Sequence, residues 1–274
     1  MREQNQPKVS IIMGIYNCEE TLSESIESII NQSYKNWELI MCDDCSKDRT
    51  FEIASKYADL YKNQIKLIRN DRNLTLGPTL NKCIKLVEGK YIARQDGDDL
   101  SDINRIEKQV NFIENNPEYD LVGTGMTSFD NFGTYARRLT KVVPKKQELM
   151  RGTTFSHATI LMKANVMKVL NGYSEEDYAK RVEDYDLWFR FFEKGYKGYN
   201  LQEYLYYVRE DRDAYKRKNL KNRINEVNIM IRGIKRLNLS KSYYVMLLKP
   251  IIAAIVPNNM LMKYHKAKFK VRDN

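Results

Sequence analysis

The chain has 274 residues but only 6 prolines, 12 glycines and 4 cysteines. Little proline and glycine beside 42% hydrophobic residues excludes a largely disordered chain and predicts a folded core. The cysteines, at positions 18, 42, 45 and 83, make no disulfide framework for a fold of this size and suit a reducing compartment. Long apolar runs are also missing. The first run, residues 9–16, is short and has no cleavage site after it, so we expect no signal peptide and a cytoplasmic protein.

Positive charge is concentrated at the C-terminal end. Residues 212–274 carry 16 Lys and Arg residues against 3 acidic ones, whereas residues 1–211 carry 30 against 33. We therefore divide the chain into a catalytic domain of residues 1–211 and a basic helical tail of residues 212–274. A basic tail can bind nucleic acid, an anionic membrane surface or only water, and its charge alone does not choose among them.

The tail also contains an apolar stretch, residues 243–257, which Lys249 and Pro250 interrupt. The stretch is shorter than the roughly 20 residues that a membrane-spanning helix needs. We expect it to lie on a bilayer rather than to cross it. The alternative is that Val245, Leu248, Ile252 and Ile255 pack on the catalytic domain.

Short apolar runs alternate with amphipathic stretches through the first half of the chain. The pattern predicts strands at residues 9–13, 37–42, 65–68, 90–93 and 121–124, and helices at residues 22–30, 50–61, 78–86 and 104–115. Such alternation is typical of an α/β fold with a mostly parallel sheet flanked by helices. Ligands of these sheets bind beyond the carboxyl ends of the strands, which is where the acidic clusters of this sequence fall.

The first acidic cluster, Asp96-Gly97-Asp98-Asp99, follows the fourth predicted strand. Three carboxylates within four residues repel one another unless a cation or water screens them. Mg²⁺ or Mn²⁺, held by one or two carboxylates and by substrate phosphates, is the usual occupant beside a nucleotide diphosphate. The simpler alternative is an exposed acidic turn.

The second acidic cluster, Asp43-Asp44, opens a loop after the second predicted strand. Asp44 could face a nucleotide base, and Ser46 or Asp48 could cap the helix that follows. Cys42 and Cys45 form a CxxC pair, but a lone pair lacks the four ligands of a structural zinc site. We interpret the thiols as packing residues.

Two further segments place titratable groups near predicted element ends. Glu183 and Asp184 begin an amphipathic helix whose apolar side carries Leu187, Phe191 and Phe192. A carboxylate at a helix start is commonly only a cap or a partner of the helix dipole. His157 precedes a strand, and it either reaches the cleft or is a buried, hydrogen-bonded histidine.

Taken together, these segments resemble family 2 of the GT-A inverting glycosyltransferases, of the type that builds bacterial capsule, O-antigen or exopolysaccharide. The resemblance covers residues 7–210 and rests on order and spacing. The matching segments are residues 9–17, 43–50, 73–81, 91–99, 156–159, 172–173 and 183–188. The chain departs from the family at Gly14, where many members have proline, and at Cys45, where many have glycine.

The resemblance implies roles for the matched positions. The backbone near Gly14 and Tyr16, together with Asp44, would recognise uracil, and Asn73 would border the nucleoside. Asp98 would be the metal ligand that bridges to the diphosphate, with Asp96 beside the ribose or metal and Arg94 nearby. Asp184 would be the catalytic base, with Glu183 and His157 as possible residues of the cleft.

The sequence therefore predicts inverting, metal-dependent transfer of a hexose or N-acetylhexosamine from a nucleotide diphosphate sugar, preferably a UDP-sugar. The acceptor would be a lipid-linked saccharide, and the enzyme would lie on the anionic inner face of the cell membrane without binding nucleic acid. Two other classes remain open. They are a metal-dependent enzyme that transfers nucleotides or acts on nucleic acid, and a non-catalytic membrane-surface binding protein.

Overall fold

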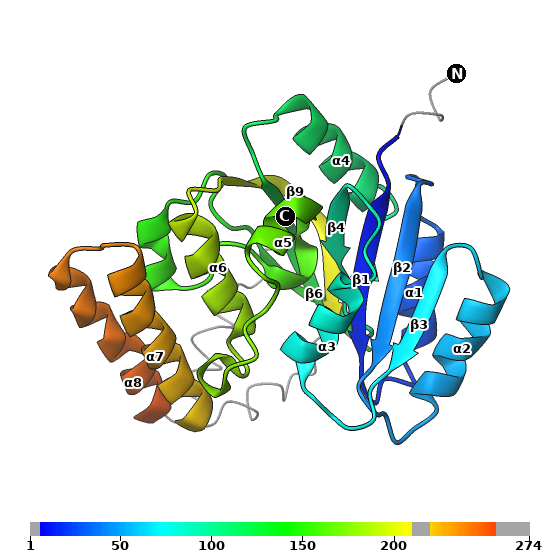
Figure 1. The fold of residues 1–274 in the computed structure, drawn as a ribbon, viewed down its shortest axis with the longest axis horizontal. Coiled ribbons are helices and arrows are strands. Elements are labelled where there is room, and N and C mark those ends of the chain that lie inside the picture. The colour runs from blue at the N-terminus through cyan, green and yellow to red at the C-terminus, as the bar shows by residue number, and fades with distance from the viewer. Residues whose placement is uncertain (1–5, 210–219, 256–274) are drawn as a thin grey trace.

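The computed structural model describes residues 6–209 and 220–255 (Figure 1). The strands are β1 (Val9–Ile15), β2 (Trp37–Asp43), β3 (Ile65–Arg69), β4 (Tyr91–Arg94), β5 (Leu100–Ser101), β6 (Leu121–Asp130), β7 (Gly133–Arg138), β8 (Leu161–Lys163) and β9 (Gly198–Arg209). The α-helices are α1 (Leu22–Ile30), α2 (Thr50–Leu60), α3 (Leu76–Ile84), α4 (Arg105–Asn115), α5 (Ala164–Val169), α6 (Glu183–Glu193), α7 (Leu220–Arg236) and α8 (Leu248–Ile255). Short 3₁₀ helices are η2 (Lys146–Arg151), η3 (His157–Thr159), η4 (Asp177–Ala179) and η6 (Lys241–Leu247).

One sheet runs through the described residues in the order β3-β2-β1-β4-β8-β6-β9-β5, with β7 paired to β6. β1 pairs in parallel with β2 and β4, and β2 pairs in parallel with β3. The expected α/β class is confirmed, and its parallel half is β1 to β4. The other half is mixed, because β8 runs antiparallel to β4 and β6, and a two-residue hairpin loop reverses the chain between β6 and β7.

β1, β2 and β4 are buried on both faces, which explains their mostly apolar sequences, whereas the edge strand β3 is only partly buried. Ile11 and Met13 of β1 pack in one core with residues of α1, α2 and α4. Ile12, which points to the opposite face, packs in a second core with residues of α3, α5 and α6. Helices therefore cover both faces, and a ligand of such a sheet is expected at the carboxyl ends of its parallel strands.

The helices of the tail lie at one end of the molecule, far from α2 and β3, with α6 between them and the sheet (Figure 1). Ile229, Met230 and Ile234 of α7 are buried in the same core cluster as Trp188 of α6. α7 thus continues the core of the catalytic domain. The expected domain boundary at residues 211 and 212, and the basic residues at 263–272, lie outside the described residues.

No helix within residues 6–209 and 220–255 is both long and apolar enough to cross a bilayer. The apolar stretch from residue 243 instead forms η6 and α8. Several of its side chains are largely exposed: Val245 (62%), Leu248 (52%), Ile251 (44%) and Ile252 (56%). The alternative of packing on the catalytic domain is therefore wrong for Val245, Leu248 and Ile252. The same stretch does pack against that core through other side chains, namely those of Tyr243, Met246 and Leu247. The side chain of Ile255 lies outside the described part of the chain.

Candidate active site

The loops that follow β1 and β2 are joined to each other at the carboxyl edge of the sheet. Backbone N–H groups of each loop donate to side chains of the other: Asn17 to Ser46 Oγ (3.1 Å), Cys18 to Thr50 Oγ1 (2.8 Å), Glu19 to Asp48 Oδ2 (3.1 Å), Lys47 to Asn17 Oδ1 (2.9 Å) and Arg49 to Glu19 Oε2 (2.9 Å). Of the two residues expected to cap α2, Asp48 contacts the helix, because its Oδ1 accepts from the Thr50 N–H at 3.0 Å. Ser46 instead contacts the other loop.

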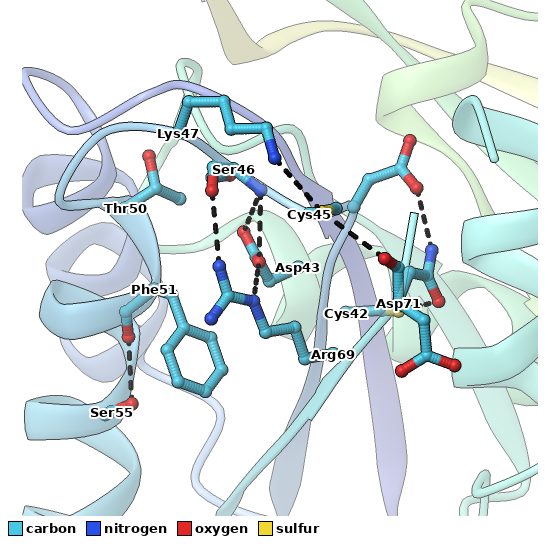
Figure 2. Close-up of polar contacts among 12 residues, drawn as sticks. Cys42, Asp43, Cys45, Ser46, Lys47, Thr50, Phe51, Ser55, Arg69 and Asp71 are labelled. Atoms are coloured by element: carbon cyan, nitrogen blue, oxygen red, sulfur yellow. Dashed lines mark hydrogen bonds and ion pairs between the residues drawn. The ribbon is translucent and has the colours of Figure 1, made fainter. Parts of the chain in front are cut away.

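Asp43, the last residue of β2, fixes the start of the second loop (Figure 2). Its Oδ2 accepts hydrogen bonds from Ser46 N (3.2 Å) and from Arg69 Nε (2.9 Å), and Arg69 Nη2 also donates to the Ser46 carbonyl oxygen at 3.2 Å. The Arg69 guanidinium lies 4.4 Å from the centre of the Phe51 ring. Between these anchors Cys45 has a φ of 63°, a left-handed conformation that favours glycine. This conformation explains why glycine suits the position in similar sequences.

The thiols divide into two pairs. Cys42 and Cys83 are buried in the core, whereas Cys18 and Cys45 are partly exposed. The expected packing role is therefore confirmed for Cys42 and wrong for Cys45, which lies on the loop after β2. Burial raises the pKa of the Cys18 thiol to about 12. At physiological pH the Cys18 side chain is therefore a neutral thiol that lines the site and does not act as a nucleophile.

Asp44 faces the loop at residues 70–75 and holds it in place. Its Oδ1 accepts from Asn70 Nδ2 (2.8 Å) and from Leu74 N (2.7 Å), and its Oδ2 accepts from Thr75 N (2.9 Å). Asn73 Nδ2 donates to the Asp44 carbonyl oxygen at 3.4 Å. A carboxylate oxygen can accept two hydrogen bonds, so Oδ2 keeps one position for a donor on a ligand.

Several residues in and near these loops have an unusual backbone conformation with positive φ. Six non-glycine residues of the described chain have positive φ, and Asn17 (48°), Cys45 (63°), Thr75 (72°) and Arg181 (67°) are four of them. Positive φ is unusual for a β-branched residue such as Thr75. Backbone strain of this kind persists where the surrounding structure enforces it, and it is concentrated at functional sites.

A cavity of about 1030 Å³ opens between the loops after β1, β2 and β4 and the start of α3. Six of the residues expected from the sequence lie in its lining: Gly14, Tyr16, Asp44, Asn73, Asp96 and Asp98. The other four, Arg94, His157, Glu183 and Asp184, lie outside this lining. Arg94 connects the two groups, because its guanidinium pairs with Asp96 and its charge also acts on His157, Glu183 and Asp184.

The Asp96-Gly97-Asp98 turn is held by its backbone, which leaves the carboxylates to other partners. Ser25 Oγ donates to the Asp96 carbonyl oxygen (2.7 Å), and Thr21 Oγ1 donates to that of Gly97 (3.2 Å). A Cβ at Gly97 would lie 3.0 Å from Cys18 Sγ and 3.1 Å from a methyl carbon of Ile15, so a side chain there would push the turn outward.

The carboxylates of the turn differ in their partners. The Asp96 carboxylate accepts hydrogen bonds from both Nη groups of the buried Arg94 guanidinium, one of them at 2.9 Å. Burial and the neighbouring Asp96 raise the pKa of Asp98 to about 6. Within the turn Asp99 is buried and Asp96 is half-buried, whereas Asp98 is exposed, as the alternative of an acidic turn expects. The Asp98 charge is costly beside Asp96, and a cation would stabilise it.

The donor set fits a divalent metal that a substrate helps to hold. Among the residues described here, no three His, Cys, Asp or Glu side chains converge as a complete metal site. Asp98, with Asp96 beside it, can supply one or two carboxylate oxygens, and Mg²⁺ and Mn²⁺ accept such a set when phosphate oxygens and water complete it.

Tyr206 and Arg209 of β9 support the turn, and no sequence pattern predicted a role for either residue. The Tyr206 hydroxyl accepts from Asp96 N at 3.0 Å, and Arg209 N donates to Asp99 Oδ1 at 2.8 Å. The fully buried Arg105 guanidinium lies over the Tyr206 ring and donates to the Arg94 carbonyl oxygen at 2.9 Å. More than 90 residues separate β9 from the turn, so only the pairing of β9 with β5 reveals these contacts.

Asp184 lies in the first turn of α6. Burial, followed by repulsion from Glu183, raises the pKa of Asp184 to about 6, although Arg94 acts in the opposite direction. Burial also raises the pKa of Glu183. The apolar side of α6 follows the expected pattern, with Leu187 and Phe191 buried and Phe192 packed against the same core. A carboxylate with a pKa near 6 is ionised at neutral pH and still basic enough to take a proton.

His157 is paired rather than free. Its Nε2 lies 2.7 Å from the Tyr173 hydroxyl, and its ring packs edge-on against Trp188. Burial, and then the charge of Arg94, hold the pKa of His157 well below 6.5, so the ring is neutral. The alternative of a buried, hydrogen-bonded histidine describes this arrangement.

Comparison with known proteins identifies the relatives of the chain. The model of the family described as Glycosyl transferase family 2 matches residues 10–171. The putative glycosyltransferase EpsE of Bacillus subtilis (strain 168) is 51% identical over 262 residues, which cover 96% of this chain and 94% of EpsE. Its name specifies neither a donor nor an acceptor. WfaP of Escherichia coli, a UDP-Glc:alpha-D-GlcNAc-diphosphoundecaprenol beta-1,3-glucosyltransferase, is 29% identical over 231 residues, which cover 81% of this chain and 85% of WfaP.

Solved structures show the same fold. The mannosyltransferase PcManGT from Pyrobaculum calidifontis, in complex with GDP-Man and Mn²⁺, superposes with a TM-score of 0.65 at 15% identity. The match covers 97% of this chain and 81% of that structure. The GT-A architecture expected from the sequence is therefore confirmed.

Proposed function

Because the chain belongs to glycosyl transferase family 2, we propose that it moves a hexose or N-acetylhexosamine from a UDP-sugar to a lipid-linked saccharide, inverting the anomeric configuration. The product would serve surface polysaccharide synthesis. One observation carries the proposal: Asp44 and Asp98 line one cavity at the carboxyl ends of β2 and β4, and the charge of Arg94 acts on both Asp98 and Asp184.

The nucleoside half of the donor would occupy the part of the cavity next to Asp44. The free position on Asp44 Oδ2 suits the N–H of a uracil ring, with Tyr16 and Asn73 beside it. The UDP-Glc in the name of WfaP supports uridine as the nucleoside.

The diphosphate half would lie at Asp98. A bound Mn²⁺ or Mg²⁺ would supply charge neutralisation for the departing diphosphate, as the Mn²⁺ complex of PcManGT supports. Asp98, and Asp96 beside it, are the residues that would hold the ion. Arg94 fixes Asp96 by its two hydrogen bonds, so the geometry of the turn is set before the donor binds.

Asp184 would act on the acceptor. Its carboxylate would take the proton of the attacking hydroxyl while the nucleoside diphosphate departs from the opposite face of the anomeric carbon. One displacement of this kind inverts the configuration. Arg94, which interacts electrostatically with both Asp96 and Asp184, would keep the base and the donor site in one charge network.

A donor screen tests the proposed activity. Purified protein with Mn²⁺ and a saccharide carried on a prenyl diphosphate is expected to release UDP from a UDP-sugar, at a rate well above that with GDP- or dTDP-sugars. If the enzyme instead prefers a GDP-sugar, the nucleoside of the donor would be guanosine rather than uridine. Donor binding without any transfer across acceptors would favour the non-catalytic binding alternative. Family membership already disfavours the nucleotidyl-transfer alternative.

We also propose that η6 and α8 dock the enzyme on the anionic inner face of the cell membrane. The exposed side chains of Val245, Leu248, Ile251 and Ile252 support this, as does the neighbouring Lys241. Each basic residue near an anionic surface contributes about 1 kcal/mol, and apolar side chains that enter the interface add to this. The acceptor in the name of WfaP is lipid-linked, and docking on the membrane would bring the active site close to an acceptor of that kind.

Replacing Leu248 and Ile252 together by glutamate is expected to release the protein from vesicles that contain anionic phospholipid. The change removes apolar area and adds repulsion from the surface. Vesicle sedimentation at low and high salt measures it. The control is Leu60→Glu, at a 73% exposed leucine of α2 outside this patch. Equal loss in the control, or binding that ignores lipid charge, would contradict the docking surface.

A further inference from the structure

Within the described part of the chain, the lining of the cavity that contains Asp98 has an excess of negative charge. Its lining carries six carboxylates and two guanidiniums: Glu19, Glu20, Asp44, Asp48, Asp96 and Asp98, with Arg181 and Arg209. The Arg209 guanidinium is engaged, because it donates to the Glu24 carboxylate and to the Asp98 carbonyl oxygen. Among the residues that the structure describes, no hydrogen bond or ion pair engages the Arg181 guanidinium.

The backbone fixes Arg181 at the cavity. Its φ of 67° is a left-handed conformation that arginine rarely adopts, so neighbouring contacts must enforce it. Val182 N donates to the Ala179 carbonyl oxygen at 3.0 Å, and Asn225 Nδ2 of α7 donates to that of Lys180 at 3.0 Å. α7 thus holds the loop that carries Arg181.

The position of Arg181 relates the donor site to the base. Arg181 comes two residues before Glu183, and its charge lowers the pKa of Glu183. At the same time its side chain borders the cavity that contains Asp98. A cation there lies between the carboxylates of the turn and the start of α6.

Building on the proposed function, we infer that the Arg181 guanidinium binds the diphosphate of the nucleotide donor. The diphosphate is the anionic part of a UDP-hexose, and a guanidinium matches phosphate oxygens with two parallel N–H donors. It would neutralise negative charge on the departing diphosphate from the side of the cavity next to α6. Arginine stays protonated, so Arg181 contributes charge and geometry and transfers no proton.

Binding of UDP and of uridine to the full-length protein separates this role from a structural one. Calorimetry is run in chelator and again with Mn²⁺. In both conditions Arg181→Gln is expected to weaken UDP by about tenfold, as loss of a charge-assisted hydrogen bond does, and to leave uridine unchanged. Arg181→Lys, which keeps the charge, is expected to recover part of the loss. Arg72→Gln is the matched control, because it removes the same charge from an exposed arginine outside the cavity lining.

Three results would overturn the inference. In the first, the wild type binds UDP well and Arg181→Gln binds it with the same affinity; this result would leave the proposed function intact. The second is an equal loss for uridine and UDP, which would assign Arg181 to the nucleoside or to the fold. The third is a wild-type protein that binds neither ligand, which would contradict the proposed function as well.

Discussion

Replacing Asp98 by asparagine is expected to abolish sugar transfer and to weaken UDP binding in the presence of Mn²⁺. The amide removes the charge that would hold the cation, while Asp96 remains paired to Arg94. UDP release and calorimetric UDP affinity, each with Mn²⁺ and with chelator, measure the two effects. In chelator, the variant should bind UDP at least as tightly as the wild type, since the lost attraction passes through the ion and the amide no longer repels the diphosphate.

The Asp98→Asn variant should remain folded. Because the folded protein raises the pKa of Asp98, its ionised form is less favourable in the fold than in the unfolded chain. At neutral pH the variant should therefore have a metal-free Tm equal to or above that of the wild type. Asp59→Asn, at an exposed aspartate of α2, is the control. Full activity of Asp98→Asn in chelator would contradict the metal assignment.

Replacing Asp184 by asparagine is expected to lower kcat by about a hundredfold or more, as loss of a general base does. Donor affinity should change little, because Asp184 lies outside the lining of the donor cavity. Steady-state kinetics at saturating donor, with UDP binding measured separately, check both statements. Lost donor binding with normal turnover at saturation would make Asp184 a donor-recognition residue.

The pH profile gives an independent test of the same residue. The base works only when deprotonated, and burial raises the pKa of Asp184 to about 6. At saturating Mn²⁺, which favours the ionised form of Asp98, the wild-type kcat should therefore fall as the pH drops through 6, and the residual activity of Asp184→Asn should lack this step. Glu183→Gln is the neighbouring control and should keep the step. A larger loss in Glu183→Gln than in Asp184→Asn would transfer the role of base to Glu183.

The sequence predicted the parallel half of the fold well because β1, β2 and β4 are buried on both faces. Apolar runs such as residues 39–42 mark such strands, and amphipathic segments mark the helices between them. α3 starts at Leu76, two residues before the expected start, because Thr75 turns the chain with a positive φ that composition does not reveal. β7 and β9 were not predicted. β7 lacks buried residues, and β9 is only partly buried, so neither carries a continuous apolar run.

The residues of the site were likewise predictable where they follow predicted strands and unpredictable where distant segments supply them. Residues of the lining, such as Asp44 and Asp98, follow predicted strands, so chain order alone brings them to one edge of the sheet. Tyr206 and Arg181 had no such signal. Tyr206 reaches Asp96 only because β9 pairs with β5, and Arg181 borders the cavity only because the loop before α6 packs against α7. Contacts between distant segments therefore set the part of the site that the sequence left open.

The configuration of the product tests the central claim most directly. With an α-linked UDP-sugar as donor and a lipid-linked saccharide as acceptor, the coupling constant of the new anomeric proton in the NMR spectrum reports the linkage. A single displacement assisted by Asp184 predicts a β-linked product. An α-linked product would contradict that displacement and with it the role of Asp184 as the base.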